Sequence, residues 1–420
     1  MELGEIANSS AADYGKPLDG IRILAAEQMQ TLPFATQLLA RLGAEVIKIE
    51  HPINGESARG ATPSMTDPNG RRVGATFLRN NLNKKSVGID LNTPEGRDLF
   101  LRLVPNFDVI GENFKPGTME KFGLSYETIN QLHPEAIVIS ISGFGNSEDS
   151  PYKNWPAYNS VAEAMSGLYD FKRKDKNPPV VNPMGAVGDI ASGLFGVIGI
   201  LAAIRHRDIT GEGQFIDLAM FDCMAALADV AINFHSMGIP REPNPPPYVI
   251  APISCSDGYL VVQFVREHQF ENLANLIGKS DWIKDPRFQE RSGWGKHLHD
   301  IIIPSIEKWS QGKSRSEISG ALAKANVASG PVLTAAEVVV DPHLNQRDMI
   351  ISMQRTDEVE DPILIPGNPI KMSKVAEGPE TRVPWVGEHT NDILLGELNL
   401  TQEELEDLRS GGIISVEDQT

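Results

Sequence analysis

The chain has 420 residues, of which 41% are hydrophobic and 22% are charged, as is typical of globular proteins. This length exceeds the usual size of a single hydrophobic core and favours two domains. The formal net charge of −18 argues against nucleic acid or an anionic membrane surface as a partner, because both would repel the chain at long range.

The chain has two cysteines, Cys223 and Cys255, which lie far apart in the sequence. They predict neither a disulfide framework nor a thiolate metal site, and the cytoplasm is the expected compartment. The polar opening of the chain lacks the basic and apolar regions of a signal peptide. No apolar run is expected to be long enough to span a membrane, and the most apolar segment, Leu194 to Ile204, is predicted to be a buried helix.

The first half of the chain alternates strand and helix patterns. A helix is predicted over 34–42, and another begins with Thr93 as its N-cap. Apolar strands separated by helices predict a parallel sheet covered on both faces. The expected strands are 21–26, 44–50, 85–91, 107–114 and 136–145.

In the second half, a helix is expected to begin near Asp189 and a sixth strand to lie within 210–222. Residues 240–247 are mostly proline, which favours a linker because proline continues neither a helix nor a central strand. Beyond this linker the patterns predict a hairpin with Asp257 and Gly258 in its turn, helices from about 269 to 325, an extended stretch after 349 and a helical tail.

Several common enzyme motifs are missing from the sequence. The first strand-to-helix turn, AAEQMQTLP, contains no glycine, which disfavours a nicotinamide dehydrogenase. There is no HExxH, and His297 and His299 are expected on a solvated face rather than at a metal, so no metal site is predicted. No GxSxG is present, and Cys223 is expected to be a buried structural thiol.

The stretch GAVGDIASGLFG, residues 185–196, places Asp189 among glycines where a helical pattern begins. Residue types alone favour a helix cap or first-turn aspartate. The alternative is a carboxylate nucleophile, which flanking glycines leave open to an acyl carbon and whose oxyanion the first amides of the helix would hold. The local sequence does not separate these two interpretations.

The segment PLDGIRILAAEQMQTLPFATQLLARLGAEVIKIEHP resembles the N-terminal signature of the class III CoA-transferases, the CaiB/BaiF family of formyl-CoA transferase and carnitine-CoA transferase. The resemblance covers about 17 to 400, in the same order. It continues through NNLNKKSVGIDLNTPEGRDLF, DVIGENFKPGTMEKFGLSYETI, ISISGFG, AMSGL, GAVGDIASG, IRHRDITGEGQFIDLAMFD and VGEHTNDILLGEL.

The resemblance implies an α/β fold. A Rossmann-like large domain is expected, with a parallel sheet formed by both chain ends, plus a smaller inserted α+β domain and an interlocked dimer. The expected boundaries are a polar arm over 1–17, the large domain over 18–225, a linker over 226–248, the small domain over 249–345 and a returning C-terminal segment over 346–420.

The family's catalytic aspartate lies in a GD step, which falls on Asp189. The implied reaction is CoA transfer from an acyl-CoA to a carboxylic acid through an aspartyl anhydride and an aspartyl-CoA thioester. A carboxylate with an ordinary low pKa would suffice, because the nucleophile must be ionised at neutral pH. CoA and acyl-CoA are then substrates, and no permanently bound cofactor is expected. A homodimer is the expected assembly, with a heteromer of homologous subunits as the alternative.

The resemblance also implies binding residues. His51 replaces an arginine common in the formyl-CoA branch and would be a weaker phosphate contact at neutral pH. The residues implied for CoA are Gln28, Met29, Gln30, His51, Lys84, Lys85, Asn113, Phe114 and Lys121, and those for the acyl or acid substrate are Phe144, Tyr158, Asn159 and Gly188.

Two other functions fit the same fold. α-Methylacyl-CoA racemases resemble the chain too, but Tyr158 and Asn159 stand where they carry a His-Asp step, and neither is a base at neutral pH. A non-catalytic subunit of a heteromer is disfavoured by the presence of Asp189. The segment APISCSDGYL lacks the glycine run of the formyl-CoA branch, so succinyl-CoA with a larger acid acceptor is the preferred substrate pair.

Overall fold

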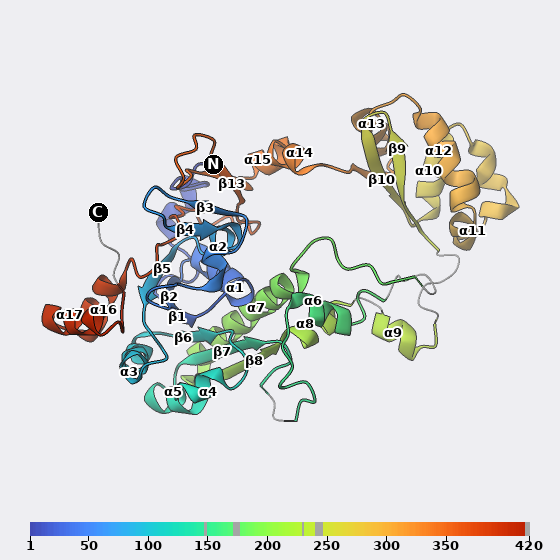
Figure 1. Cartoon of the computed structure of the whole chain (residues 1–420). Coiled ribbons are helices and arrows are strands. Elements are labelled where there is room, and N and C mark those ends of the chain that lie inside the picture. Colours follow the sequence, from blue (N-terminus) through green and yellow to red (C-terminus); the bar gives the residue numbers. More distant parts are fainter. Residues whose placement is uncertain (147–148, 171–176, 229–230, 240–246, 416–420) are drawn as a thin grey trace. The chain divides into compact units, whose positions relative to one another are not determined.

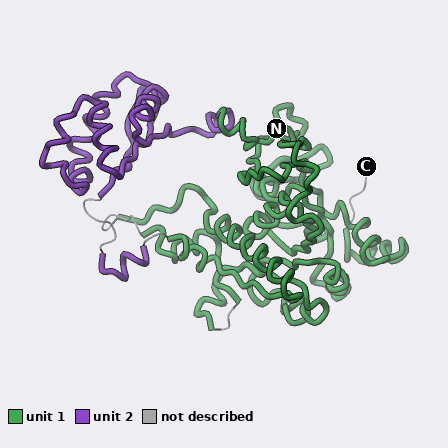
Figure 2. Tube along the Cα trace, turned by 180° about the vertical axis from the view of Figure 1, so that it is seen from behind, with its two compact units in different colours: residues 1–170, 177–228, 342–420 green, residues 171–176, 229–341 purple. Residues whose placement is uncertain are grey.

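The computed structural model describes residues 1–146, 149–170, 177–228, 231–239 and 247–415. The chain divides into two compact units, shown in green and purple in Figure 2. Unit 1 comprises residues 1–170, 177–228 and 342–420, and unit 2 comprises 171–176 and 229–341. Most of the predicted proline-rich linker, residues 240–246, lies outside the described residues.

Unit 1 is built on a six-stranded parallel sheet (Figure 1). The strand order is β5-β2-β1-β6-β7-β8, so β1 and β6 are neighbours at the point where the winding of the sheet reverses. The predicted α/β fold is confirmed, and all six strands lie between residues 22 and 219. Their bounds are β1 Arg22–Ala26, β2 Glu45–Glu50, β5 Lys84–Gly88, β6 Val109–Glu112, β7 Ile137–Ser142 and β8 Phe215–Ala219.

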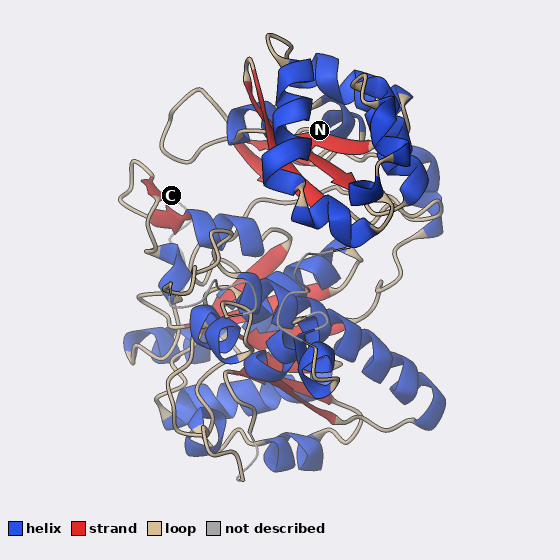
Figure 3. Ribbon diagram, turned by 90° about the vertical axis from the view of Figure 1, so that its right-hand side faces the viewer, coloured by secondary structure: helices blue, strands red, loops and turns tan. Residues whose placement is uncertain are grey.

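Helices cover both faces of this sheet (Figure 3) because its strands are apolar on both sides. Ile23 and Ala25 pack in one core cluster with α1 (Thr31–Arg41) and α7 (Val187–Thr210). Leu24 and Ala26, which alternate with them along β1, pack in the other cluster, which includes residues of α3, α5, α16 and α17. The bounds of these four helices are α3 Pro94–Leu103, α5 Tyr126–Leu132, α16 Thr390–Leu398 and α17 Gln402–Ser410.

The C-terminal segment returns to unit 1 without adding a strand to the six-stranded sheet. It forms its own pair, β12 (Ile350–Met353) with β13 (Ile363–Pro366), and packs in one cluster with β3 (Ser64–Thr66) and β4 (Arg72–Gly74). The expectation that both chain ends contribute strands to the parallel sheet is therefore wrong. Both ends belong to unit 1, but only the N-terminal part of the chain supplies strands to this sheet. The other elements of unit 1 are η1 Ser9–Tyr14, η2 Ser57–Arg59, α2 Ala75–Asn80, η3 Val104–Asn106, α4 Thr118–Lys121, α6 Asn159–Met165, α8 Met220–Leu227 and α15 Pro342–Gln346.

Helix α7 is long and strongly apolar and, by length and composition alone, could cross a membrane. The expectation that no segment reaches that length is therefore wrong. Within unit 1 the helix packs against α1, α6, α8, β7 and β8, and half of its apolar window is buried. The prediction of a buried helix over 194–204 is therefore corrected, because one side of it packs in the core while Leu194, Ile198 and Leu201 are exposed within the chain.

Unit 2 contains a three-stranded antiparallel sheet of order β11-β10-β9, with strands β9 Val249–Cys255, β10 Gly258–Phe264 and β11 Ala328–Pro331. The predicted hairpin is present, but its turn is Ser256–Asp257, because Gly258 already pairs with Cys255. Helical residues pack on this sheet in a separate core cluster. The helices of unit 2 are α9 Ala231–Ser236, α10 Glu267–Leu276, η4 Ser280–Lys284, η5 Pro286–Phe288, α11 Arg291–Lys296, η6 Leu298–Ile302, α12 Ile303–Ser310, α13 Arg315–Lys324 and α14 Ala335–Val339.

Candidate active site

A cavity of about 450 Å³ lies where β1, β6 and β7 end. Ligands of open α/β sheets bind outside the carboxyl ends of the strands, at the reversal of strand order, which here falls between β1 and β6. The cavity is lined by predicted residues from segments far apart in sequence: Gln28, Met29, Gln30, Asn113, Phe114, Phe144, Tyr158, Asn159 and Asp189.

The two chain segments at the reversal point are tied together by an amide pair. Asn113 Oδ1 accepts the Gln28 backbone N–H at 2.8 Å, and Asn113 Nδ2 donates to the Gln28 carbonyl at 2.9 Å. This pairing fixes the turn after β1 against the segment after β6. Both segments then form one wall of the cavity.

Asp189 is the third residue of α7, and its half-buried carboxylate lies in this cavity. It is not the helix cap, because Ala186 occupies the N-cap position. Its partner is instead Thr31, the first residue of α1, whose Oγ1 donates to Asp189 Oδ1 at 2.5 Å. The carboxylate is thus held by another helix rather than by its own.

The close approach of α1 and α7 explains this contact. At Gly193, an added Cβ would lie 2.7 Å from the Thr31 carbonyl oxygen, so only glycine allows the two helices to come this near. At Gly196, an added Cβ would meet Ile141 at 3.2 Å. Both glycines serve the packing of α7 against α1 and β7, and the expectation that they leave Asp189 open to an acyl carbon is wrong for these two positions.

The charge environment of Asp189 differs from that of an ordinary surface aspartate. Burial raises its pKa, the Thr31 hydrogen bond opposes the rise, and the carboxylate of Glu163 adds to it. The expectation of an ordinary low pKa is therefore corrected. A raised pKa goes with a more basic and less solvated carboxylate, which favours nucleophilic attack as long as the group stays ionised.

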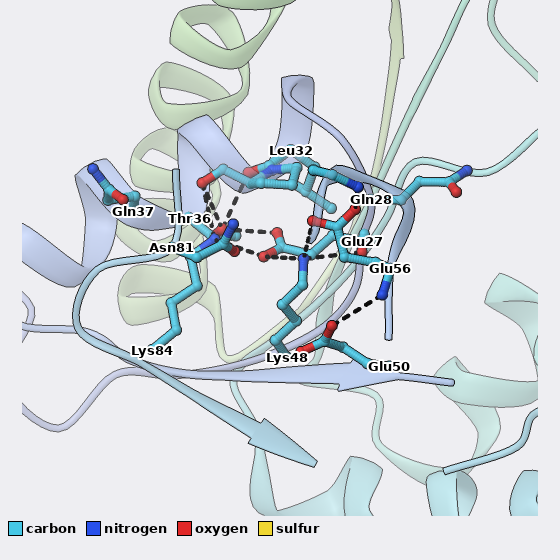
Figure 4. Close-up of polar contacts among 12 residues, drawn as sticks. Glu27, Gln28, Leu32, Thr36, Gln37, Lys48, Glu50, Glu56, Asn81 and Lys84 are labelled. Carbon is cyan, nitrogen blue, oxygen red and sulfur yellow. Dashed lines mark hydrogen bonds and ion pairs between the residues drawn. The ribbon is translucent and has the colours of Figure 1, made fainter. Parts of the chain in front are cut away.

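The turn that carries Gln28, Met29 and Gln30 rests on a buried network of charges (Figure 4). Met29 has a φ of +60°, and its N–H donates to Glu56 Oε2 at 3.0 Å. Lys48, which is fully buried, donates to the Glu27 carbonyl at 3.1 Å and lies 3.5 Å from Glu56 Oε1. These contacts hold a backbone conformation that a methionine rarely adopts.

Lys84 belongs to the same network and departs from its predicted role at CoA. Its side chain is fully buried, and Nζ donates to Glu27 Oε1 at 2.6 Å, to the Pro33 carbonyl and to Asn81. Burial alone would raise the pKa of Glu27, but the ammonium groups of Lys84 and Lys48 outweigh it and hold that pKa low. In this conformation the Lys84 ammonium is not available to a phosphate.

Lys85 and Lys121 also lie apart from the cavity. Lys85 is 43% exposed and pairs with Glu45 at 2.6 Å, near the amino-terminal end of β5, whereas the cavity lies at the carboxyl ends of the strands. Lys121 ends α4 and is exposed. Neither residue is brought to the cavity wall by the fold.

A second cavity of about 330 Å³ adjoins the first, with Gln28 and Phe114 in the walls of both. His51 lines this second cavity, together with Asp90 and Asn92. His51 Nδ1 accepts the backbone N–H groups of Ile53 and Asn54, so its imidazole is fixed by the loop that follows β2.

Three of the residues predicted for the acyl or acid substrate line the cavity but differ in their exposure to solvent. Phe144 is nearly buried and packs against the rings of Tyr152, Trp155 and Phe221, with centroids 5.3, 6.4 and 6.2 Å away. Tyr158 lines the cavity but is 74% exposed. Asn159 begins α6 on the same wall.

Gly188 is buried behind the cavity wall rather than facing a substrate. An added Cβ would lie 2.9 Å from the Asn159 carbonyl oxygen. Its N–H donates to Glu163 Oε1 at 2.9 Å, so this first-turn amide is not free to hold an oxyanion. Gly188 therefore contributes packing between α6 and α7, in place of the substrate contact that was expected.

The residues of the site that sequence reasoning missed include Thr31, Lys153 and Glu163. Thr31 was missed because α1 begins before Pro33, which a first helical turn tolerates since its N–H is not needed there. Lys153 lines the cavity and Glu163 lies behind Gly188, and no local motif marks either residue. Within the described residues, no three His, Cys, Asp or Glu side chains gather as a metal site.

Comparison with known proteins gives a consistent result. Residues 18–390 match CoA-transferase family III. The succinyl-CoA:mesaconate CoA-transferase of Haloarcula hispanica is 32% identical over 385 residues, which cover 90% of this chain and 95% of that protein. The succinate–glutarate CoA-transferase of Agrobacterium fabrum is 33% identical over 392 residues, with the same coverage.

Among solved structures, a CaiB/BaiF family protein from Brucella suis is similar with a TM-score of 0.78 and 34% identity, over 91% of this chain and all of that one. The family match and the structural similarity each cover nearly the whole chain, and the cavity lies within the matched residues. The protein therefore belongs to CoA-transferase family III, the class III CoA-transferases.

Proposed function

We propose that this enzyme transfers CoA through covalent intermediates on Asp189. The observation that carries the proposal is the position of the Asp189 carboxylate, in the cavity at the strand reversal and hydrogen-bonded by Thr31 at 2.5 Å. Such a carboxylate faces the acyl group of a bound thioester and is held in one orientation for attack.

The donor half of the reaction has two steps. An Asp189 oxygen bonds to the thioester carbon, the C–S bond breaks, and its electron pair leaves with the CoA thiolate, which gives a mixed anhydride. The thiolate then attacks the aspartyl carbonyl, the anhydride C–O bond breaks, and the donor acid leaves as a carboxylate. The enzyme now carries an aspartyl-CoA thioester.

The acceptor half repeats these steps in reverse. The acceptor carboxylate attacks the aspartyl thioester and releases the thiolate. The thiolate then attacks the acyl carbon of the new anhydride, which frees Asp189 and the product acyl-CoA. Each step exchanges one acyl bond for another of similar energy, so the residues of the cavity supply mainly position and charge.

We place the acyl end of the substrate in the larger cavity and the nucleotide end of CoA in the smaller one. The two cavities share Gln28 and Phe114, which gives a continuous path for the pantetheine arm. His51 lies in the smaller cavity, where it would approach the phosphate end of CoA. Lys84, Lys85 and Lys121 are not part of this placement.

The substrate class we propose is a dicarboxylic acid, with succinyl-CoA as the donor. Both similar enzymes are named for succinate or succinyl-CoA and a second dicarboxylic acid. The cavity contains Lys153 on the side of the aromatic cluster, in addition to Asp189. An ammonium group there would bind the distal carboxylate while the proximal one reacts.

Lys153→Met is expected to raise KM for a dicarboxylic acceptor about tenfold or more, because a charge-assisted hydrogen bond is lost. KM for a monocarboxylic acid of equal length should change by less than about twofold. Steady-state transfer from succinyl-CoA to glutarate and to butyrate provides the measurement. Lys115→Met, on the same cavity wall after β6, is the matched control and should not discriminate between the two acids. An equal loss with both acids in Lys153→Met would contradict this specificity.

The assembly we propose is a homodimer in which a second copy covers an apolar face of α7. Leu194, Ile198 and Leu201 follow one another at helical spacing and are 47, 62 and 37% exposed within the chain. Light scattering on the purified protein is expected to give twice the chain mass. Ile198→Glu should lower that mass, whereas Leu132→Glu on α5 should leave it unchanged. A monomeric mass for the unsubstituted chain would overturn the homodimer and favour a heteromer with a homologous subunit.

A further inference from the structure

Glu163 is a buried carboxylate that the transfer mechanism does not use. It lies in α6, and its side chain has no exposure to solvent. Oε2 accepts the hydroxyl of Tyr169, and Oε1 accepts Asn159 Nδ2 at 3.3 Å and the Gly188 N–H at 2.9 Å. A carboxylate this fully removed from water depends on such bonds for its stability.

The bond to Gly188 connects Glu163 to the first turn of α7. Gly188 is the second residue of that helix, and its N–H is one of the amides that the helix itself leaves unbonded. The Glu163 carboxylate satisfies it, and a negative charge at a helix N-terminus is favourable. Because Asp189 follows directly, whatever fixes the Gly188 amide also fixes the backbone of Asp189.

We propose that Glu163 is a positioning residue of the transfer reaction, which fixes the first turn of α7 and places a second carboxylate near Asp189. This inference rests on the proposed role of Asp189 as nucleophile. The positioning follows from the bonds of Glu163 to Gly188 and Asn159, which join α6 to α7. The charge has a separate consequence for the chemistry.

Acylation moves a negative charge away from Asp189. The carboxylate oxygen bonds to the thioester carbon, and the electron pair of the broken C–S bond leaves with the CoA thiolate. Asp189 is then a neutral anhydride. A fixed carboxylate beside Asp189 repels the ionised starting state more than the acylated product, so the charge of Glu163 favours acylation.

The other groups that face this turn do not supply that charge. Burial and the bond to Glu163 raise the pKa of Tyr169 to about 12, so its hydroxyl stays protonated at neutral pH. Burial raises the pKa of the Cys223 thiol on α8. From α1 the contact is the neutral Thr31. Besides Asp189, the ionisable side chains that line the cavity are Lys115, Lys153 and Tyr158.

Glu163→Gln removes the charge and keeps a side-chain oxygen for the Gly188 amide. The test measures the rate of hydroxamate formation at Asp189 with saturating succinyl-CoA and hydroxylamine, from acidic to neutral pH. Expressed relative to the unsubstituted enzyme, the rate is expected to fall about tenfold on the plateau. The acidic side of the pH–rate profile, where the rate of hydroxamate formation falls (the acid limb), should move to lower pH by about one unit. The reason is that Asp189 ionises more easily without a like charge nearby.

Two variants, with one control, separate the effect of the Glu163 charge from the effect of its hydrogen bonds. Tyr169→Phe removes a partner of Glu163 but keeps its charge, so the acid limb should not move to lower pH. Thr31→Val removes the hydrogen bond that favours ionised Asp189 and should move the acid limb to higher pH. Glu95→Gln, at an exposed first-turn glutamate of α3, should match the unsubstituted enzyme.

The inference is overturned if the acid limb of Glu163→Gln lies at the same pH as that of the unsubstituted enzyme. It is also overturned if the acid limb of Tyr169→Phe moves to lower pH by as much as that of Glu163→Gln. If Glu163→Gln fails to fold, the Tyr169→Phe variant decides. A shift of its acid limb to lower pH overturns the inference, and an acid limb at the pH of the unsubstituted enzyme supports it. A complete lack of hydroxamate in the unsubstituted enzyme would instead reject the proposed function of Asp189 and is thereby distinguished.

Discussion

Asp189→Asn is expected to lower the rate of CoA transfer by at least about 10³-fold. The amide is nearly the same size and still accepts the hydrogen bond from Thr31, so the cavity should keep its shape. It is not a nucleophile, however, and neither the anhydride nor the aspartyl thioester forms. Binding of acyl-CoA, measured by calorimetry, should change by less than about threefold because Asp189 contributes to chemistry more than to affinity.

The matched control for this variant is Asp222→Asn. Asp222 is also an aspartate in the first turn of a helix, α8, but its side chain is exposed. Transfer should stay within about twofold of the unsubstituted enzyme. Near-normal transfer by Asp189→Asn would reject the covalent mechanism. Loss of substrate α-protons to deuterated water by the unsubstituted enzyme would point instead to racemase chemistry.

Lys84→Met is expected to lower the free energy of unfolding by about 3–5 kcal/mol, whereas Lys85→Met should lower it by less than about 1 kcal/mol. The two lysines are neighbours in β5, and each pairs with a glutamate at 2.6 Å. Only Lys84 is fully buried, so only its removal leaves the buried Glu27 carboxylate with a single ammonium partner, Lys48 at 3.6 Å. Denaturant unfolding of the three proteins provides the measurement.

Two further results would follow from the same cause. The loss in Lys84→Met should grow as pH rises, since the partly unpaired Glu27 would then have a raised pKa in the folded state and resist ionisation. Adding Glu27→Gln should recover part of the stability, because the remaining buried Lys48, Arg59, Glu50 and Glu56 balance in charge. Equal losses in the Lys84 and Lys85 variants would show that burial does not decide the effect.

The sheet of unit 1 was predictable because burial on both faces leaves a simple signal in the sequence. Strands such as Ile137–Ser142 are apolar on both sides, and helical patterns separate them. The helix start at Thr93 was also predictable, since its hydroxyl caps the Gly96 amide. The contribution of the C-terminal segment was predicted less well, because packing onto a unit and pairing in its sheet give the same extended pattern.

The candidate site was predictable only where its residues lie in local motifs. Gln28, Asn113 and Asp189 come from three separate motifs, and the strand order brings them to one cavity. The contact between Thr31 and Asp189 joins residues 158 positions apart, and no local pattern reports it. Lys84 and Lys85 show the same limit, because two adjacent lysines give no sign that one of them is buried against Glu27.

The most direct test of the covalent mechanism follows oxygen atoms into Asp189. In the proposed sequence, an oxygen of the acceptor acid remains on the Asp189 carboxylate each time product acyl-CoA forms. After turnover of succinyl-CoA with an ¹⁸O-labelled dicarboxylic acceptor, the peptide that contains Asp189 should therefore gain ¹⁸O, as seen by mass spectrometry. Labelled product acyl-CoA together with an unlabelled Asp189 would contradict a mechanism in which this carboxylate carries the acyl group.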